Sequence, residues 1–376
     1  MFFQNARILC PDFTFRTGGF EVSDGRFGRI LPDSLPADAM DLHGATVIPG
    51  LVDIHTHGNS GADFSDGDYD GLAAMAGFYA QCGVTSFAPA SMTLPYEVLA
   101  RAFANARRLA DDPPADAAIL RGIHMEGPYL SHGKRGAQSA EYLKAPDFAG
   151  FQSLNERSGN LVRIVDIAPE LPGALDFIRL AKEVCTVSVA HTEADYDGAK
   201  LGFQAGATHL THLFNAMPAL HHRTPGVIAA AAEDPKVRAE LICDGHHVHP
   251  AMVRLAFRLF GSERMILVSD SGRCCGMGEG SRFTLGGQEA QLLDGVARLP
   301  DGTIACSCVS LYDCMVKAMA FGIAEIDAIR AATYNPACAI GADGEVGSIA
   351  PGKRADFLVC SPDYRHKRVF LGGKEL

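Results

Sequence analysis

The sequence predicts an α/β fold: a (β/α)₈ barrel joined to a small β-sandwich domain that is built from both chain termini. Short apolar runs that suit buried parallel strands occur eight times in the middle of the chain, and helical stretches separate most of them. Strand-like segments broken by Gly, Asp and Pro occupy both ends of the chain. These observations together predict one barrel between two halves of a small domain.

The small domain is predicted from short apolar segments near each end of the chain. They lie at residues 7–9, 19–22 and 45–48, and again at 356–360 and 368–371. We therefore assign residues 1–49 and 345–376 to this domain and residues 50–344 to the barrel.

The barrel strands are predicted in chain order at residues 51–54, 85–88, 120–124, 162–167, 186–190, 208–211, 240–243 and 265–269. Helices are expected at residues 71–82, 96–110 and 174–184. Long gaps near residues 127–160 and 271–325 are typical of loops that contact substrate. An open, doubly wound sheet is disfavoured because no Gly-rich phosphate fingerprint follows the first strand.

Composition excludes several classes of protein. Hydrophobic residues make up 47% of the 376 residues and charged residues 20%, which predicts a large folded core. A net charge of −11 argues against a surface for nucleic acid or anionic membrane. The eleven cysteines are an odd number without paired spacing, which indicates reduced thiols and no disulfide framework. No apolar run approaches the roughly 18 residues of a membrane span, and no secretory signal is visible, so we expect a cytoplasmic protein.

Polar side chains gather at the carboxyl ends of the predicted strands, which meet at one mouth of a barrel. They are His55 and His57, Glu126, His191, His212, the stretch 244–247, and Asp270. Each histidine alone is explained better by packing or surface exposure than by metal binding. Four histidines and two carboxylates at one mouth are hard to explain by packing, because buried charges need partners. The set therefore predicts a divalent metal site.

A metal with these ligands lowers the pKa of a bound water to about 7. A free carboxylate then takes the proton of the water and returns it to a leaving group. Asp270 is the candidate because it is the one acid at the end of the eighth predicted strand. Its alternatives are a metal ligand or a helix cap.

Several motifs over essentially the whole chain resemble the amidohydrolase superfamily, and within it the N-acetylglucosamine-6-phosphate deacetylases. They are PGLVDIHTHG at residues 49–58, HMEGPY at 124–129, THLFNAMP at 211–218, RTPG at 223–226, DGHHV at 244–248, VSD at 268–270 and GSIAPGKRAD at 347–356. The resemblance implies hydrolysis of the N-acetyl group of N-acetylglucosamine 6-phosphate in amino-sugar catabolism. The alternative substrate is another N-acyl amino sugar, such as N-acetylgalactosamine 6-phosphate.

The resemblance also implies roles for single residues. Glu126, His191 and His212 would hold the principal ion, and His55 and His57 a second one with Glu126 bridging; zinc is the first choice, with iron and manganese as alternatives. Asp270 would be the acid/base. The sugar phosphate would lie against His247, Asn215 and Ala216, and against Arg223 from a neighbouring subunit, which implies a homodimer.

The chain departs from the family near the acyl end of the site. Gln138 stands where the family has a histidine that polarises the acetyl carbonyl, so a neutral amide would take this catalytic role. Cys274 and Cys275 follow Asp270, and Cys306 and Cys308 replace a glycine-serine stretch.

Two other functions were weighed against deacetylation. A ring-opening amidohydrolase of the dihydroorotase or hydantoinase kind often has a carboxylated lysine at the end of the fourth strand, and none follows residues 162–167. A non-catalytic assembly module should have lost metal ligands, whereas this chain retains them all.

Overall fold

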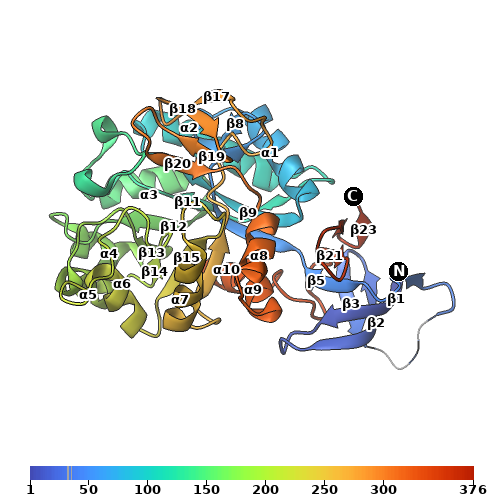
Figure 1. Ribbon diagram of the computed structural model, residues 1–376. Helices are drawn as coiled ribbons and strands as arrows, with labels where there is room; N and C mark the ends of the chain where they lie inside the picture. The colour runs from blue at the N-terminus through green and yellow to red at the C-terminus, as the bar shows by residue number, and fades with distance from the viewer. Residues whose placement is uncertain (32–33, 35) are drawn as a thin grey trace.

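The computed structural model describes residues 1–31, 34 and 36–376, and it has the predicted barrel (Figure 1). The barrel strands follow one another in the order β6 (Leu51–Thr56), β9 (Val84–Ser91), β10 (Ile119–Leu120) with β11 (Ile123–Met125), β12 (Val162–Ile167), β13 (Thr186–Val189), β14 (His209–Leu210), β15 (Arg238–Ile242) and β16 (Met265–Val268). All eight predicted strands are confirmed. The third is divided into β10 and β11 by Arg121 and Gly122.

The barrel strands are largely buried on both faces, because helices cover the outside and side chains fill the inside. Every residue of β6 and of β9 is buried. The first and last strands meet through Asp270, whose N–H donates to the carbonyl of His55 at 2.9 Å. The Ser269 hydroxyl donates to the Asp53 carboxylate at 2.5 Å. This contact places the ends of β6 and β16 side by side.

Ten α-helices occur in the described part of the chain. They are α1 (Tyr69–Gln81), α2 (Tyr96–Asp111), α3 (Phe148–Arg157), α4 (Ala174–Ala181), α5 (Tyr196–Ala205), α6 (Gly226–Glu233), α7 (Pro250–Phe260), α8 (Leu311–Ala320), α9 (Glu325–Ala332) and α10 (Tyr334–Ala339). Side chains cap several N-termini; the Asp195 carboxylate, for example, accepts from the Gly198 N–H at 2.8 Å. The three predicted helices are confirmed as α1, α2 and α4. None of the ten is both long and apolar enough to cross a membrane.

Both chain ends form one separate sheet beside the barrel, as predicted (Figure 1). Its strands run in the order β23 (Lys374–Glu375), β22 (Lys367–Leu371), β21 (Phe357–Cys360), β5 (Thr46–Pro49), β1 (Phe2–Leu9), β2 (Phe15–Ser23) and β3 (Arg26–Ile30), with β4 (Met40–Asp41) on β1. Phe3 and Phe20 from one end pack with Phe357 and Phe370 from the other. We keep residues 49/50 and 344/345 as the proposed domain boundaries.

The long gap after the eighth barrel strand contains a small sheet that the sequence did not predict. It consists of β17 (Arg282–Leu285), β18 (Gln288–Leu293), β19 (Val296–Arg298) and β20 (Ile304–Ser307), all antiparallel. The Gln288 amide donates to the carbonyl of Ala137 at 2.6 Å, so the sheet contacts the loop that follows Glu126. A two-stranded ribbon, β7 (Gly58–Asn59) with β8 (Ala62–Asp63), lies after His57.

The prediction that the cysteines are reduced thiols is wrong for one pair. Cys274 and Cys308 form a disulfide, and the other nine cysteines are free. The two residues meet because the inserted sheet returns the chain to its starting point. There the N–H of Ser307 donates to the carbonyl of Asp270 at 2.8 Å. Spacing alone could not reveal this return.

Candidate metal centre

The Glu126 carboxylate, directly after β11, is the point on which the predicted histidines converge. Its Oε1 lies 2.9 Å from His191 Nε2 and 3.3 Å from His212 Nε2, and its Oε2 lies 3.2 Å from His57 Nε2. All four side chains are buried. Burial opposes ionisation of Glu126, but hydrogen bonds from His191 and His212 outweigh it and keep its pKa well below the usual range. Glu126 is therefore an anion that faces several imidazoles.

Asp270 faces the same point from the last barrel strand. Its Oδ1 lies 3.3 Å from His57 Nε2 and 3.7 Å from His55 Nε2. Burial raises the pKa of Asp270, but the hydrogen bond with His57 and the charge of His55 lower it below its ordinary value. The carboxylate is thus ionised at neutral pH and able to accept a proton.

Three of these residues lie in the left-handed region of backbone space. The φ angle is +43° at His191, +28° at His212 and +46° at Asp270. A non-glycine residue there costs roughly 1–3 kcal/mol and persists only where its surroundings impose it. Each is the second residue after the end of a barrel strand, so the turn directs its side chain to the mouth. Strain at three converging side chains is an independent sign of a functional site.

The donor atoms fit a divalent ion. His191 Nε2 and His212 Nε2 lie 3.1 Å apart, and both face Glu126 Oε1. Ligands about 2.1 Å from a tetrahedral ion are separated by about 3.4 Å, close to these distances. His191 Nδ1 donates to the Lys134 carbonyl at 2.8 Å, so Nε2 is the ring nitrogen that can bind an ion once an ion replaces its proton. The set of Glu126, His191 and His212 is thus compatible with one divalent metal ion.

A second set of donors adjoins the first. His55, His57 and Glu126 also place three ligand atoms within reach of one ion. His57 Nδ1 donates to the Ala90 carbonyl at 3.1 Å, so its Nε2 is free to bind. His55 Nε2 is buried and has no hydrogen-bond partner among the residues that the structure describes. A buried nitrogen without a partner is costly unless a ligand satisfies it, which supports metal binding here.

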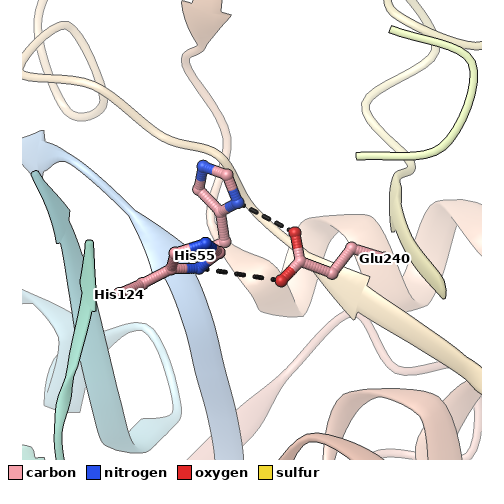
Figure 2. A group of neighbouring side chains, drawn as sticks. All are labelled: His55, His124 and Glu240. Carbon is pink, nitrogen blue, oxygen red and sulfur yellow. Dashed lines mark hydrogen bonds and ion pairs between the residues drawn. The ribbon is translucent and has the colours of Figure 1, made fainter. Parts of the chain in front are cut away.

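A third group, His55, His124 and Glu240, lies on the far side of the His55 ring (Figure 2). It is a hydrogen-bonded layer and not a further ion site, because both His124 nitrogens are occupied. Nδ1 donates to the Ile54 carbonyl at 3.0 Å, and Nε2 lies 2.9 Å from Asp166 Oδ1. Sequence reasoning assigned no role to Glu240 or Asp166. The available signal was an acid placed inside an otherwise apolar strand.

Gln138 is buried next to the centre, not turned away from it. Its Nε2 donates to Glu126 Oε2 at 2.7 Å, and its Oε1 accepts from the Thr93 N–H at 2.7 Å. A primary amide carries two N–H bonds, so one remains for another acceptor. Gln138 thus holds the Glu126 carboxylate in place.

The predicted phosphate-binding residues lie at different depths. His247 is half-buried as a residue, but its side chain is only 6% exposed, with Nδ1 2.7 Å from the Asp244 carboxylate. Asn215 follows His212 closely, and its amide donates to the His212 carbonyl at 3.3 Å. Ala216 is half-buried with φ +53°. Arg223 is exposed before α6 and forms no ion pair with any described residue.

The chain is similar to known proteins over nearly its whole length. The model of the amidohydrolase family matches residues 46–376. The N-acetylgalactosamine-6-phosphate deacetylase of Escherichia coli O157:H7 is 33% identical, covering 98% of this chain and 97% of its own. The N-acetylglucosamine-6-phosphate deacetylase of Bacillus subtilis is 33% identical, with 96% and 93% covered. The structure of a mutant N-acetyl-D-glucosamine-6-phosphate deacetylase from Mycobacterium smegmatis, in complex with N-acetyl-D-glucosamine-6-phosphate, superimposes with a TM-score of 0.93 at 33% identity, with 100% and 98% covered.

Proposed function

The chain belongs to the amidohydrolase family, and we propose that it hydrolyses N-acetylglucosamine 6-phosphate to glucosamine 6-phosphate and acetate with the help of a divalent metal. The observation that carries the proposal is the convergence of Glu126, His191, His212 and Asp270 at one buried point. The nearly full-length similarity to deacetylases supports the substrate class.

The ion would be held by Glu126, His191 and His212, with His55 and His57 available for a second one. Zinc is our first choice, and iron and manganese accept the same nitrogen and carboxylate ligands. A divalent ion supplies Lewis-acid activation of water and of the amide carbonyl. The fixed Nδ1 donors of His57 and His191 present the Nε2 atoms in the form that binds metal.

Asp270 would move the proton. Its ionised carboxylate accepts a proton from the attacking water while the oxygen of that water bonds to the acetyl carbon. The carboxylic acid then gives this proton to the sugar nitrogen as the C–N bond breaks, so that the amine leaves neutral. The acetic acid that forms loses its remaining proton to solvent and leaves as acetate beside the amino sugar, and Asp270 returns to its starting state.

Gln138 would complete the acyl end of the site. The N–H of its amide that does not bond Glu126 is available to the acetyl oxygen, on which negative charge develops. Because an amide donor is neutral, its contribution should be smaller than that of a charged histidine.

The phosphate would lie against His247, Asn215 and Ala216, with Arg223 supplied by the partner chain of a homodimer. The exposed position of Arg223 supports such a reach, because a guanidinium on a surface loop can enter a neighbouring site. A cytoplasmic location is part of the proposal. The nine free cysteines favour a reducing compartment, and the disulfide between Cys274 and Cys308 is the feature that argues against one.

N-Acetylgalactosamine 6-phosphate is the second candidate substrate, because the Escherichia coli relative of that name matches nearly the whole chain. The test is acetate release from both sugar phosphates and from unphosphorylated N-acetylglucosamine. We expect the highest kcat/KM for N-acetylglucosamine 6-phosphate and a large loss without the phosphate. No acetate release from either phosphate would refute the proposal, and a higher kcat/KM for the galacto sugar would reassign the substrate.

A further inference from the structure

Glu240 is a fully buried carboxylate in β15 that the proposed reaction does not use. It lies on the opposite side of the His55 ring from Glu126. Glu240 Oε2 is hydrogen-bonded to Nδ1 of the ring, whereas Glu126 Oε1 lies 3.8 Å from Nε2. Figure 2 shows its two carboxylate oxygens directed at two different imidazoles, those of His55 and His124. A buried anion in this position requires an explanation, since burying a charge is costly unless it is bonded.

The hydrogen bonds of Glu240 fix the state of the His55 ring. Oε2 lies 2.8 Å from His55 Nδ1, and Oε1 lies 3.0 Å from His209 Nε2. A carboxylate has no proton to give, so His55 Nδ1 is the donor. When the ring is neutral, as it is in a metal ligand, its lone pair is then on Nε2, the buried atom without a partner that faces Glu126 and Asp270. Only this tautomer can bind a metal at that face.

The other three histidines of the centre are held differently. His57 and His191 donate from Nδ1 to backbone carbonyls, and His212 Nδ1 has no partner within the described residues. A carboxylate behind a ligating histidine orients the ring and raises its basicity. Among these four histidines, His55 is the one with such a carboxylate on Nδ1.

Charge supports the same assignment. Two divalent ions bring four positive charges, whereas Glu126 and Asp270 bring two negative ones. His124 and Asp166 lie 2.9 Å apart and can offset each other. Glu240 adds a third negative charge directly behind His55, where a second ion would bind. Its contribution should be large, because charges interact strongly in a buried site.

From these contacts we infer that Glu240 is the positioning residue that makes His55 a metal ligand, and that it thereby decides whether a second divalent ion binds. The inference rests on the two-ion part of the proposed function. It assigns to Glu240 no contact with the substrate. Its Oε2 also accepts from the His212 N–H at 3.3 Å. Because the amide oxygen of Gln can keep that hydrogen bond, the ion held by Glu126, His191 and His212 should be little affected. The expected phenotype is therefore selective: one ion is weakened and the other is not.

The test is Mn²⁺ and Zn²⁺ binding to the metal-free full chain, measured as ions bound per chain against free metal. The wild type should bind two ions. Glu240→Gln keeps the shape and removes the charge, and it should weaken the second ion about 10–100-fold while the first stays within about threefold. The control is Asp166→Asn, which removes another buried carboxylate from the same layer but contacts His124 instead of His55. It should retain two ions of wild-type affinity.

A double-mutant cycle with His55→Gln tests whether Glu240 acts through His55. In that background, Glu240→Gln should have no further effect on metal binding. If Glu240→Gln does not fold, ¹⁵N NMR of the histidine side chains in the wild type replaces the binding measurement. The His55 signals are identified as those that disappear in His55→Gln, and they must show the proton on Nδ1.

The outcomes separate the two proposals. One ion in the wild type refutes the two-ion function and this inference with it. Two ions in the wild type with unchanged affinities in Glu240→Gln refute the role of Glu240 alone. Equal weakening of both ions, the same loss in Asp166→Asn, or an Nε2 proton on His55 would also overturn that role.

Discussion

Asp270 combines an ionised carboxylate with a position facing the histidines of the centre, so its loss should affect the chemical step most. Asp270→Asn keeps the shape of the side chain but cannot accept a proton. We expect kcat to fall by roughly two to four powers of ten, with the bound metal and KM little changed. Parallel steady-state kinetics and metal analysis check this. Loss of metal together with activity would show that Asp270 is a ligand, and near wild-type kcat would require another base.

The pH dependence of phosphate binding should follow His247. Burial lowers the pKa of His247, but the hydrogen bond with Asp244 outweighs it and raises the pKa above its ordinary value. A raised pKa keeps the imidazolium, which attracts phosphate, to higher pH, and this attraction is lost as pH rises through that pKa. The ratio of kcat/KM for phosphorylated to unphosphorylated substrate should therefore fall on the alkaline side.

Asp244→Asn is the matched test of this pH effect. It removes the charge that raises the pKa of His247, so the fall in the ratio should begin at a lower pH. Taking the ratio cancels the titration of groups that serve both substrates. A ratio that does not vary between pH 7 and 10, or that is identical in the variant, would remove His247 from phosphate binding.

At the scale of single residues, the side chains at the barrel mouth could be predicted from the sequence, whereas the buried carboxylate behind them could not. Glu126, His191, His212 and Asp270 could be predicted because they follow apolar runs whose ends meet in a barrel. Glu240 could not be distinguished from an ordinary strand residue, since its partners are 31 and 185 positions away along the chain. The left-handed turns at the three strand ends are likewise set by tertiary packing and leave no pattern in the sequence.

Among the elements, the barrel strands were predictable and the inserted sheet was not. A strand buried on both faces needs a continuous apolar run, which stands out in the sequence. β17 has two exposed residues out of four, and β18 has only two buried residues out of six. Such short, half-polar strands resemble loops until their partners are known. The disulfide depends on the same fold-back and was missed for the same reason.

The disulfide gives the inserted sheet a measurable signature. Without reductant, the denatured chain should show nine reactive thiols, and eleven after reduction. The disulfide closes a loop of 34 residues. Its removal in Cys308→Ser should therefore lower the free energy of unfolding by about 3–4 kcal/mol under non-reducing conditions. Adding reductant should remove the difference between this variant and the wild type. Eleven reactive thiols in the untreated chain would contradict the pairing.

For the whole molecule, the two chain ends are joined by an aromatic core. Phe357 and Phe370 stack at 4.5 Å between ring centroids, and Phe3 and Phe20 at 4.8 Å. Short apolar segments predicted strands at both ends of the chain. They did not indicate which strands pair, because the pairing between β5 and β21 spans some 300 residues. Distant segments with matching apolar character were enough to predict a shared domain, but they did not reveal which strands pair or in which register.

This core predicts a structural effect that is separate from catalysis. Phe357→Ala removes a fully buried ring and should lower the free energy of unfolding by about 3–5 kcal/mol. Phe283→Ala, at a half-buried position of the inserted sheet, is the control and should lose clearly less. Urea unfolding measures both, and metal content of the folded protein should not change. A loss below about 1 kcal/mol for Phe357→Ala would show that the ends do not share one core.

The most direct test of the metal-dependent deacetylase is a titration of the metal-free chain with Zn²⁺, in which bound ion and acetate release from N-acetylglucosamine 6-phosphate are followed together. Activity should be absent after chelation and rise in proportion to the first ion bound. Glu126→Gln replaces the carboxylate that is common to both candidate ion sites. The variant should therefore lose about a hundredfold or more in activity at the same free zinc concentration. Full acetate release by the chelated chain, or wild-type activity in Glu126→Gln, would contradict the account.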